Sequence, residues 1–310
     1  MGHDRRTPTF AISPASRMVT TLSASIDRAY EPTLDVLVRS SVWLSAALAS
    51  LTLFTAHVLR LPVDLRPLTL VLASSLWIYN MDHLRDAGEG TESAYFTRPS
   101  LRILMVASFA ATALLLVGAP TRVLPVFFGY SLVGLLYSIP VIPTLNSRGV
   151  HWARVKDAPG AKSWIVAAAI ATATVGLPVA FSGSPFSFQA FCVWSFFFVF
   201  VGTGAHMCDV RDIAADREEG VLTLPVLLGV SGAKRLLGLL NLGFLLLLTL
   251  AWAFDGFGTH PEILAVCAVA CLYVYWIRPS SPREAWSVAL DGAFFLPASL
   301  ALIHESFHGT

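Results

Sequence analysis

Apolar stretches close to the length of a membrane crossing recur along the chain, separated by charges, glycine or proline. A hydrocarbon layer about 30 Å thick requires about 20 mostly apolar helical residues. The stretches lack the period-two alternation of a membrane barrel, so helices satisfy their backbone amides most simply. The pattern predicts an all-α fold, a polytopic membrane bundle.

Nine transmembrane helices are expected, of which the second and eighth are short. They cover residues 41–58, 67–81, 101–118, 123–139, 163–181, 188–207, 236–254, 263–277 and 287–304. Helices two and six run into acidic segments, and helices four and eight end in an aromatic residue followed by proline. This weak repeat indicates a four-plus-four duplication with one helix left over. Composition agrees, because 55% of the residues are hydrophobic and 13% are charged, against roughly 25% charged in soluble domains.

Basic residues predict the orientation, since lysine and arginine gather on the cytoplasmic side. With the N-terminus inside, only Arg60, Arg66 and Arg122 of the 21 basic residues fall outside. We therefore expect an integral protein of the cell inner (plasma) membrane, with its N-terminus and acid-rich loops cytoplasmic and its C-terminus on the opposite side. Residues 1–40 show no signal peptide and are predicted to be a cytoplasmic arm, whereas residues 41–310 form the membrane domain.

Other partner classes are disfavoured by composition. The formal net charge is +1 and no basic patch is interleaved with aromatics, so nucleic acid is not an expected partner. The four cysteines show no zinc or iron spacing and are expected to be buried thiols.

Three aspartates follow the sixth predicted helix. Asp209, Asp212 and Asp216 are spaced three and four apart, which places them on one face if the segment is helical. Like charges so placed repel, and Mg²⁺ commonly bridges carboxylates to substrate phosphates. A solvated, mixed-charge loop is the alternative, because arginines and glutamates lie among the acids.

The stretch "DVRDIAADREEGVLTLPVLLG" decides between these alternatives. It resembles the second aspartate-rich motif of the UbiA-type intramembrane prenyltransferases, including Gly220 and the tail Thr223-Leu224-Pro225. The resemblance extends over nearly the whole chain after about Pro32. It implies a UbiA-like nine-helix fold, Mg²⁺ held by Asp209, Asp212 and Asp216, and a prenyl diphosphate donor whose diphosphate binds through the metal.

The first motif departs from that family. The family has an asparagine with acids four and eight residues later, whereas Asn80 is followed at those offsets by Leu84 and Gly88. Asp82 and Asp86 share a helical face from which Asn80 is turned by roughly 160°.

Two interpretations of this departure remain open. Either Asp82 and Asp86 replace the family's asparagine and first aspartate as metal ligands, with Gly90 at the third position, or part of the metal set is lost. In the second case Glu89 and Glu92 are available to compensate. Under either interpretation, Asn80 is a substrate-binding candidate.

Cationic and aromatic candidates complete the diphosphate site. Arg98-Pro99 resembles the family's Arg-Pro, and Tyr137 begins a Tyr-x-x-Pro followed by a basic loop. Lys156 in that loop matches the family's lysine, which implies a catalytic role beside the leaving diphosphate. Lys162 and Arg211 are further substrate-binding candidates, although positive-inside anchoring explains them equally well.

Two polar residues within the predicted spans add candidates. Asp291 lies inside helix nine, where an ionisable side chain is costly, so it either contacts the acceptor or pairs with a cytoplasmic arginine. His206 is either a base or a hydrogen-bonded residue at a helix end.

We expect a Mg²⁺-dependent prenyltransferase that moves an isoprenoid chain to a lipophilic acceptor, of aromatic or quinone-precursor type, within the lipid bilayer. Asp209, Asp212 and Lys156 are the expected catalytic residues. The alternatives are a UbiA-type intramembrane terpene cyclase, a non-catalytic relative and a membrane transporter. A transporter site usually lies near the bilayer midplane, unlike these acids.

Overall fold

The structure is a computed structural model that describes residues 36–86, 99–136, 139–146, 149–155, 158–253, 260–281 and 285–308. The proposed arm therefore lies almost entirely outside the described residues and stays a prediction.

Helices account for most of the described chain. In order, the elements are α2 Val42–Val58, α3 Leu65–Asp86, α5 Pro99–Val117, α6 Val123–Leu136, β1 Pro140–Asn146, β2 Gly149–Arg154, α7 Lys162–Ala171, η2 Thr172–Gly176, α8 Leu177–Ser182, α9 Phe188–Arg211, α10 Ile213–Glu219, α11 Leu224–Ala253, α12 Pro261–Trp276, η3 Ala285–Leu290, η4 Ala293–Phe295 and α13 Leu296–His308.

Each of the nine predicted spans coincides with helical structure. Five helical stretches are long and apolar enough to cross a membrane, namely Pro99–Val117, Lys162–Ser182, Phe188–Arg211, Leu224–Leu250 and Trp286–Phe307. Three further apolar helices, Val42–Val58, Val123–Leu136 and Pro261–Trp276, are shorter. The protein is an integral membrane helix bundle, and the count of nine crossings stays a prediction.

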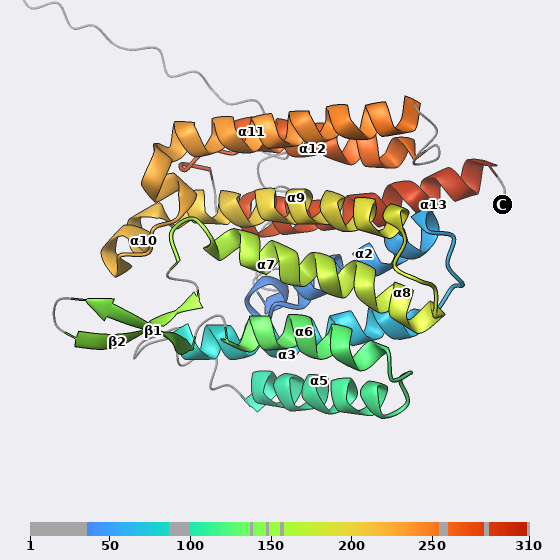
Figure 1. The fold of residues 1–310 in the computed structure, drawn as a ribbon, viewed down its shortest axis with the longest axis horizontal. Helices are drawn as coiled ribbons and strands as arrows, with labels where there is room; N and C mark the ends of the chain where they lie inside the picture. Colours follow the sequence, from blue (N-terminus) through green and yellow to red (C-terminus); the bar gives the residue numbers. More distant parts are fainter. Residues whose placement is uncertain are drawn as a thin grey trace, which may run out of the picture.

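The outermost helix shows the apolar surface expected of a lipid-facing element. In α5, Ile103, Val106 and Leu114 are 68%, 68% and 74% exposed, and this helix lies at the edge of the bundle beside α3 (Figure 1). Water would disfavour so much contiguous apolar surface, whereas lipid tails accept it. The exposed face therefore supports membrane embedding independently of helix length.

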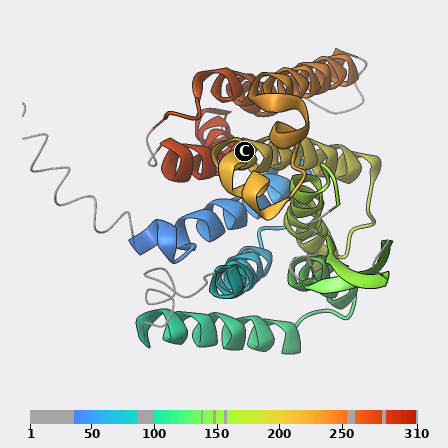
Figure 2. The ribbon, with the colours of Figure 1, turned by 90° about the vertical axis from the view of Figure 1, so that its left-hand side faces the viewer.

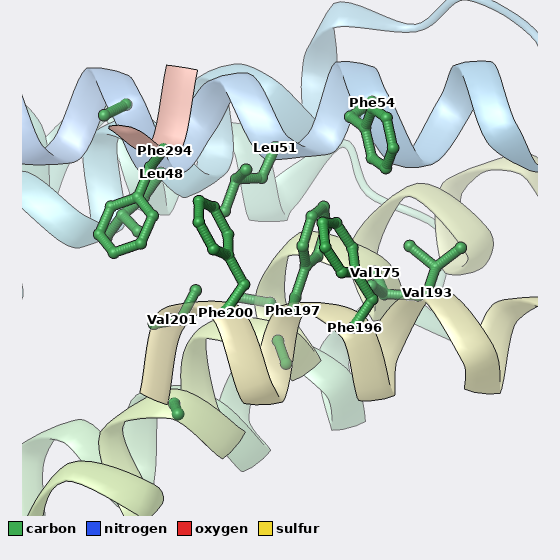
Figure 3. Close-up of a cluster of buried hydrophobic side chains, with 14 of the residues drawn as sticks. Leu48, Leu51, Phe54, Val175, Val193, Phe196, Phe197, Phe200, Val201 and Phe294 are labelled. Atoms are coloured by element: carbon green, nitrogen blue, oxygen red, sulfur yellow. The ribbon is translucent and has the colours of Figure 1, made fainter. Parts of the chain in front are cut away.

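Helix α9 forms the centre of the bundle and packs against α7, α11, α12 and α2. Its side chains Phe196, Phe197 and Phe200 point toward α2 and Phe294 of η4 (Figure 3). The rings of Phe196 and Phe200 stack with centroids 5.8 Å apart, and Phe200 meets Phe294 edge-on at 5.4 Å. Such pairs add about 0.5–1.5 kcal/mol each beyond area burial. This aromatic layer fixes α9, and hence the aspartates at its end.

Hydroxyl and amide side chains join helices where lipid provides no hydrophobic driving force. Asn241 Nδ2 on α11 donates to Thr203 Oγ1 on α9 at 2.7 Å. Thr55 Oγ1 on α2 donates to the carbonyl of Thr174 in η2 at 3.0 Å. Element η2 is a π-helical turn just before Pro178, and its wider backbone accommodates a proline that lacks a donor and crowds the preceding turn.

The described residues are overwhelmingly helical, as the all-α prediction expects, and a short β-hairpin after α6 is an addition to it. Strands β1 and β2 pair antiparallel, with Asn146 opposite Gly149 and Thr144 opposite His151. The segment contains Val141, Ile142 and Trp152, residue types that favour strands, whereas the sequence analysis expects a basic loop there. The hairpin and α10 lie at one end of the bundle and the end of α13 at the other (Figure 1), and Figure 2 views the bundle from the end with the hairpin and α10.

Candidate functional site

Asp209 lies in the last turn of α9 and is only 3% exposed. Its Oδ2 accepts a hydrogen bond from Ser163 Oγ at 2.6 Å and lies 3.3 Å from His206 Nδ1. Its Oδ1 lies 3.4 Å from Lys162 Nζ. Since α7 begins at Lys162, the start of α7 and the end of α9 meet through this carboxylate.

Asp216 in α10 lies beside the same lysine. Its Oδ1 is 3.1 Å from Lys162 Nζ, and its Oδ2 accepts from Thr223 Oγ1 at 3.1 Å. The chain turns back to bring Thr223 there because Gly220 ends α10 in the left-handed region, at φ 74°, a conformation that glycine adopts without a steric penalty. Burial raises the pKa of the Asp216 carboxyl, while Lys162 and Thr223 partly offset this by stabilising the charged form.

Asp212 lies in a break between α9 and α10. Its backbone angles, φ −92° and ψ 8°, interrupt the helix that the spacing predicted to be continuous, so the expectation of one helical face for all three aspartates is corrected. Arg211 donates to both of its carboxylate oxygens at 2.7 Å. Asp209 and Asp216 thus share one lysine, whereas Asp212 pairs with a half-exposed arginine.

The first acidic segment lies on α3. Asn80 is fully buried and its Nδ2 donates to the carbonyls of Ser40 at 2.9 Å and Leu76 at 2.7 Å, while its Oδ1 has no hydrogen-bond partner. Asp82 instead lines a cavity between α3, α6 and α7. The predicted divergence between Asn80 and Asp82 is confirmed. The side chain of Asp86 lies outside the described part of the structure.

The cavity below Asp82 has a volume of about 90 Å³ and is almost wholly apolar. Its walls come from α2, α3, α6, α7 and η2, and include Ile78, Val133, Ile165, Ala169 and Ala173. The hydroxyl of Tyr130, which also lines it, is hydrogen-bonded to Ser74 Oγ at 2.9 Å. A carboxylate among its lining residues and an apolar interior suit a molecule with a charged end and a hydrocarbon tail.

A family model described as VviA prenyltransferase matches residues 42–296. The chain belongs to this prenyltransferase family, which agrees with the resemblance to UbiA-type enzymes found in the motif. No curated protein matches the sequence.

Solved structures of UbiA homologues share the fold of this VviA family member. A UbiA homologue from Archaeoglobus fulgidus bound to GPP and Mg²⁺ superposes with a TM-score of 0.59 at 14% identity, covering 87% of this chain and 98% of that one. The same coverage and identity hold for the homologue bound to DMAPP and Mg²⁺, at a TM-score of 0.58. A form bound to Cd²⁺ gives 0.56 at 17% identity, with 85% and 98% covered.

Several predicted site residues of this family member lie outside the described residues. They are Lys156, Arg98 and Tyr137, so their roles stay predictions. Asp291 is half-buried at the junction of η3 and η4, and its role stays a prediction. His206 is buried against Trp164, with the two ring centroids 4.7 Å apart, and its Nδ1 lies near Asp209 Oδ2. The prediction of a hydrogen-bonded residue at a helix end is confirmed.

Sequence reasoning missed the two hydroxyl groups that hold the carboxylates. Thr223 was noted only as part of the motif's tail, and Ser163 was not singled out at all. The position of Ser163 next to Lys162 could have indicated its role, because a serine in the first turn of a helix places its hydroxyl near the N-terminus of that helix. Lys162, one of several basic candidates, is the described lysine that contacts both buried aspartates.

Proposed function

We propose that the protein is a Mg²⁺-dependent membrane prenyltransferase that moves an isoprenoid chain from a prenyl diphosphate to a lipophilic acceptor of aromatic or quinone-precursor type. One observation carries this proposal. The first two turns of α7 contribute Lys162 and Ser163 to the aspartate cluster and Ile165 to the apolar cavity. The charged diphosphate and the apolar isoprenoid chain of one substrate can therefore occupy adjoining parts of one site.

The donor atoms near α7 fit a hard divalent cation. Asp209 and Asp216 are both buried, and Lys162 supplies one positive charge between two carboxylates. The pair keeps a negative charge in a poorly solvated place, which a cation would relieve. Asn80, whose buried Oδ1 is unpartnered, stays a substrate-binding candidate on a different face of α3. Mg²⁺ takes oxygen ligands and bridges one or two carboxylates to phosphates, as the Mg²⁺ and GPP in the A. fulgidus structure support by analogy.

Each described residue has a defined task in the proposed reaction. Mg²⁺, when bound, neutralises charge that develops on the departing diphosphate. Ser163 and Thr223 hold Asp209 and Asp216 in position by hydrogen bonds. Lys162 Nζ lies where it can turn from the carboxylates to a diphosphate oxygen and stabilise the same charge.

The cavity walls would orient the isoprenoid and exclude water. Ile78, Ile165 and Ala169 present hydrocarbon to the chain, so the allylic carbon meets the acceptor rather than a water molecule, whose attack would hydrolyse the donor. We carry over from the family resemblance that Lys156, Arg98, Tyr137 and Asp86 add to the diphosphate end, and that Asp212 is a metal ligand. Arg211 and Asp291 would border the opening of this diphosphate site, and we propose that the opening faces the cytoplasm.

Purified protein in detergent tests this proposal. Binding and turnover of geranyl, farnesyl and geranylgeranyl diphosphates are measured with Mg²⁺ or with EDTA, for wild type, Asp209→Asn, Asp216→Asn and Asp82→Asn. Glu218→Gln is the matched control, because Glu218 is an exposed acid in α10. We expect Mg²⁺-dependent binding that the three aspartate variants lose and the control keeps.

Product analysis separates the alternatives. Prenylation only when an aromatic acceptor is added supports the transferase. A terpene released without an acceptor would indicate the cyclase, and absence of Mg²⁺-dependent diphosphate binding in the wild type would indicate a non-catalytic relative.

A further inference from the structure

A second polar cluster lies at the end of the bundle opposite Asp209. It consists of His57 in the last turn of α2, His260 and Glu262 at the start of α12, and His304 and Glu305 near the end of α13. The ends of α2 and α13 lie together on that side, away from α10 (Figure 1). None of these side chains takes part in the proposed transferase site.

Glu262 is the buried centre of this cluster, with its side chain only 3% exposed. Its Oε1 lies 3.0 Å from His260 Nδ1 and 3.3 Å from His57 Nε2. Its Oε2 has no hydrogen-bond partner among the described residues, and His304 Nδ1 lies 3.9 Å from it. A buried carboxylate oxygen without a donor is costly, so the cluster has room for one more positive group.

His57 shows what kind of group is missing. Its Nδ1 lies 2.6 Å from Glu305 Oε1, and because a carboxylate only accepts, the ring proton is on Nδ1. A neutral imidazole then directs the lone pair of Nε2 toward Glu262 Oε1, at 3.3 Å. Two acceptors so close repel unless a proton or a metal ion lies between them. A histidine oriented through its other nitrogen by a carboxylate is the usual second-shell arrangement of a metal ligand.

We propose that His57, His260 and Glu262 form a binding site for a divalent metal ion of the zinc class. Their ligand atoms all lie within 4.8 Å of one another. Donors about 2.0–2.1 Å from a tetrahedral Zn²⁺ stand about 3.3 Å apart, close to the 3.0 and 3.3 Å observed around Oε1. Small side-chain shifts complete the site.

The donor types select the metal. Two imidazoles and one carboxylate suit Zn²⁺ and its neighbours among the transition metals, whereas Mg²⁺ and Ca²⁺ take oxygen ligands. His304 is the candidate fourth donor. A cavity of about 670 Å³ lined by His57, His260, His304 and Glu305 adjoins the cluster and gives an ion or a water ligand access. The bound ion would clamp α2, α12 and α13 together at this end.

Metal analysis of the full-length protein in detergent tests the proposal. Protein stripped with a chelator is equilibrated with Zn²⁺ in excess Mg²⁺, desalted and analysed by inductively coupled plasma mass spectrometry. We expect one zinc per chain in the wild type and in Asp209→Asn/Asp216→Asn, and none in His260→Ala or Glu262→Gln. The control is His83→Ala, which removes an exposed histidine at the other end and should keep the zinc.

A second measurement does not depend on the variants folding. Co²⁺ added to the stripped wild type should give the intense visible absorption of a four-coordinate site, which Zn²⁺ abolishes and Mg²⁺ leaves unchanged. A wild type that holds no zinc would overturn the proposal and leave a protonated histidine as the missing cation. Zinc lost in the aspartate double variant but kept in Glu262→Gln would overturn it as well, by assigning the ion to the other end.

Discussion

Lys162 Nζ lies 3.1 Å from Asp216 Oδ1, so a residue at the start of α7 is joined to one that follows 54 positions later in α10. The same nitrogen lies 3.4 Å from Asp209 Oδ1. In the structure the lysine therefore stands between two buried carboxylates, the position that the proposed reaction needs for a divalent cation and a diphosphate.

Replacing Lys162 by methionine should make folding depend more on Mg²⁺. The change leaves two buried carboxylates without their ammonium, at a cost of about 1.5–3 kcal/mol when Mg²⁺ is absent. We expect the Tm in EDTA to fall and added Mg²⁺ to raise it more than in the wild type. Differential scanning fluorimetry measures both shifts. Equal Mg²⁺ shifts in the two proteins would contradict the idea that lysine and metal neutralise the same carboxylates.

Replacing Thr223 by valine should weaken catalysis while keeping the shape of the side chain. Thr223 Oγ1 donates to Asp216 Oδ2 at 3.1 Å, and a hydrogen bond to a charged group is worth about 1.5–3 kcal/mol. We expect kcat/KM to fall roughly tenfold or more, since each 1.4 kcal/mol is tenfold. Thr223→Ser restores the hydroxyl and should recover most of the activity. Similar losses in both variants would argue for a packing role instead.

Asp212→Asn should separate activity from stability. Its ion pair with Arg211 is about 40% exposed on both partners, and exposed pairs contribute about 0–1 kcal/mol. If Asp212 is a metal ligand, Mg²⁺-dependent turnover should be lost while Tm stays nearly unchanged. Asp209→Asn, at a buried site, should lower both. Full turnover by Asp212→Asn would remove this residue from the metal set.

A larger side chain in the apolar cavity should select shorter donors. Ala169 lines the cavity, whereas the neighbouring Ala168 does not, so Ala169→Leu and Ala168→Leu form a matched pair on α7. We expect Ala169→Leu to raise KM for geranylgeranyl diphosphate several-fold, because it shortens the space for the tail, and to leave geranyl diphosphate little affected. Steady-state kinetics with both donors decides. If Ala168→Leu discriminates equally, the tail lies elsewhere.

The sequence by itself determined that this protein is a helical membrane bundle with an aspartate-rich prenyltransferase motif. Membrane thickness sets the length of an apolar helix, and the motif's residues are consecutive, so both are local properties of the chain. Helical structure was correctly predicted at all nine spans. The hairpin from Pro140 to Arg154 was missed because strand pairing depends on a partner that periodicity does not reveal.

Only the tertiary structure decided which side chains meet. The backbone breaks from helical geometry at Asp212, and Asp209 and Asp216 on either side of the break share Lys162. Ser163 reaches Asp209, 46 residues later, because α7 and α9 lie side by side. His57, Glu262 and Glu305 come from separate helices and form no sequence motif. Such contacts arise from the packing of whole helices, so no local pattern of residues could predict them.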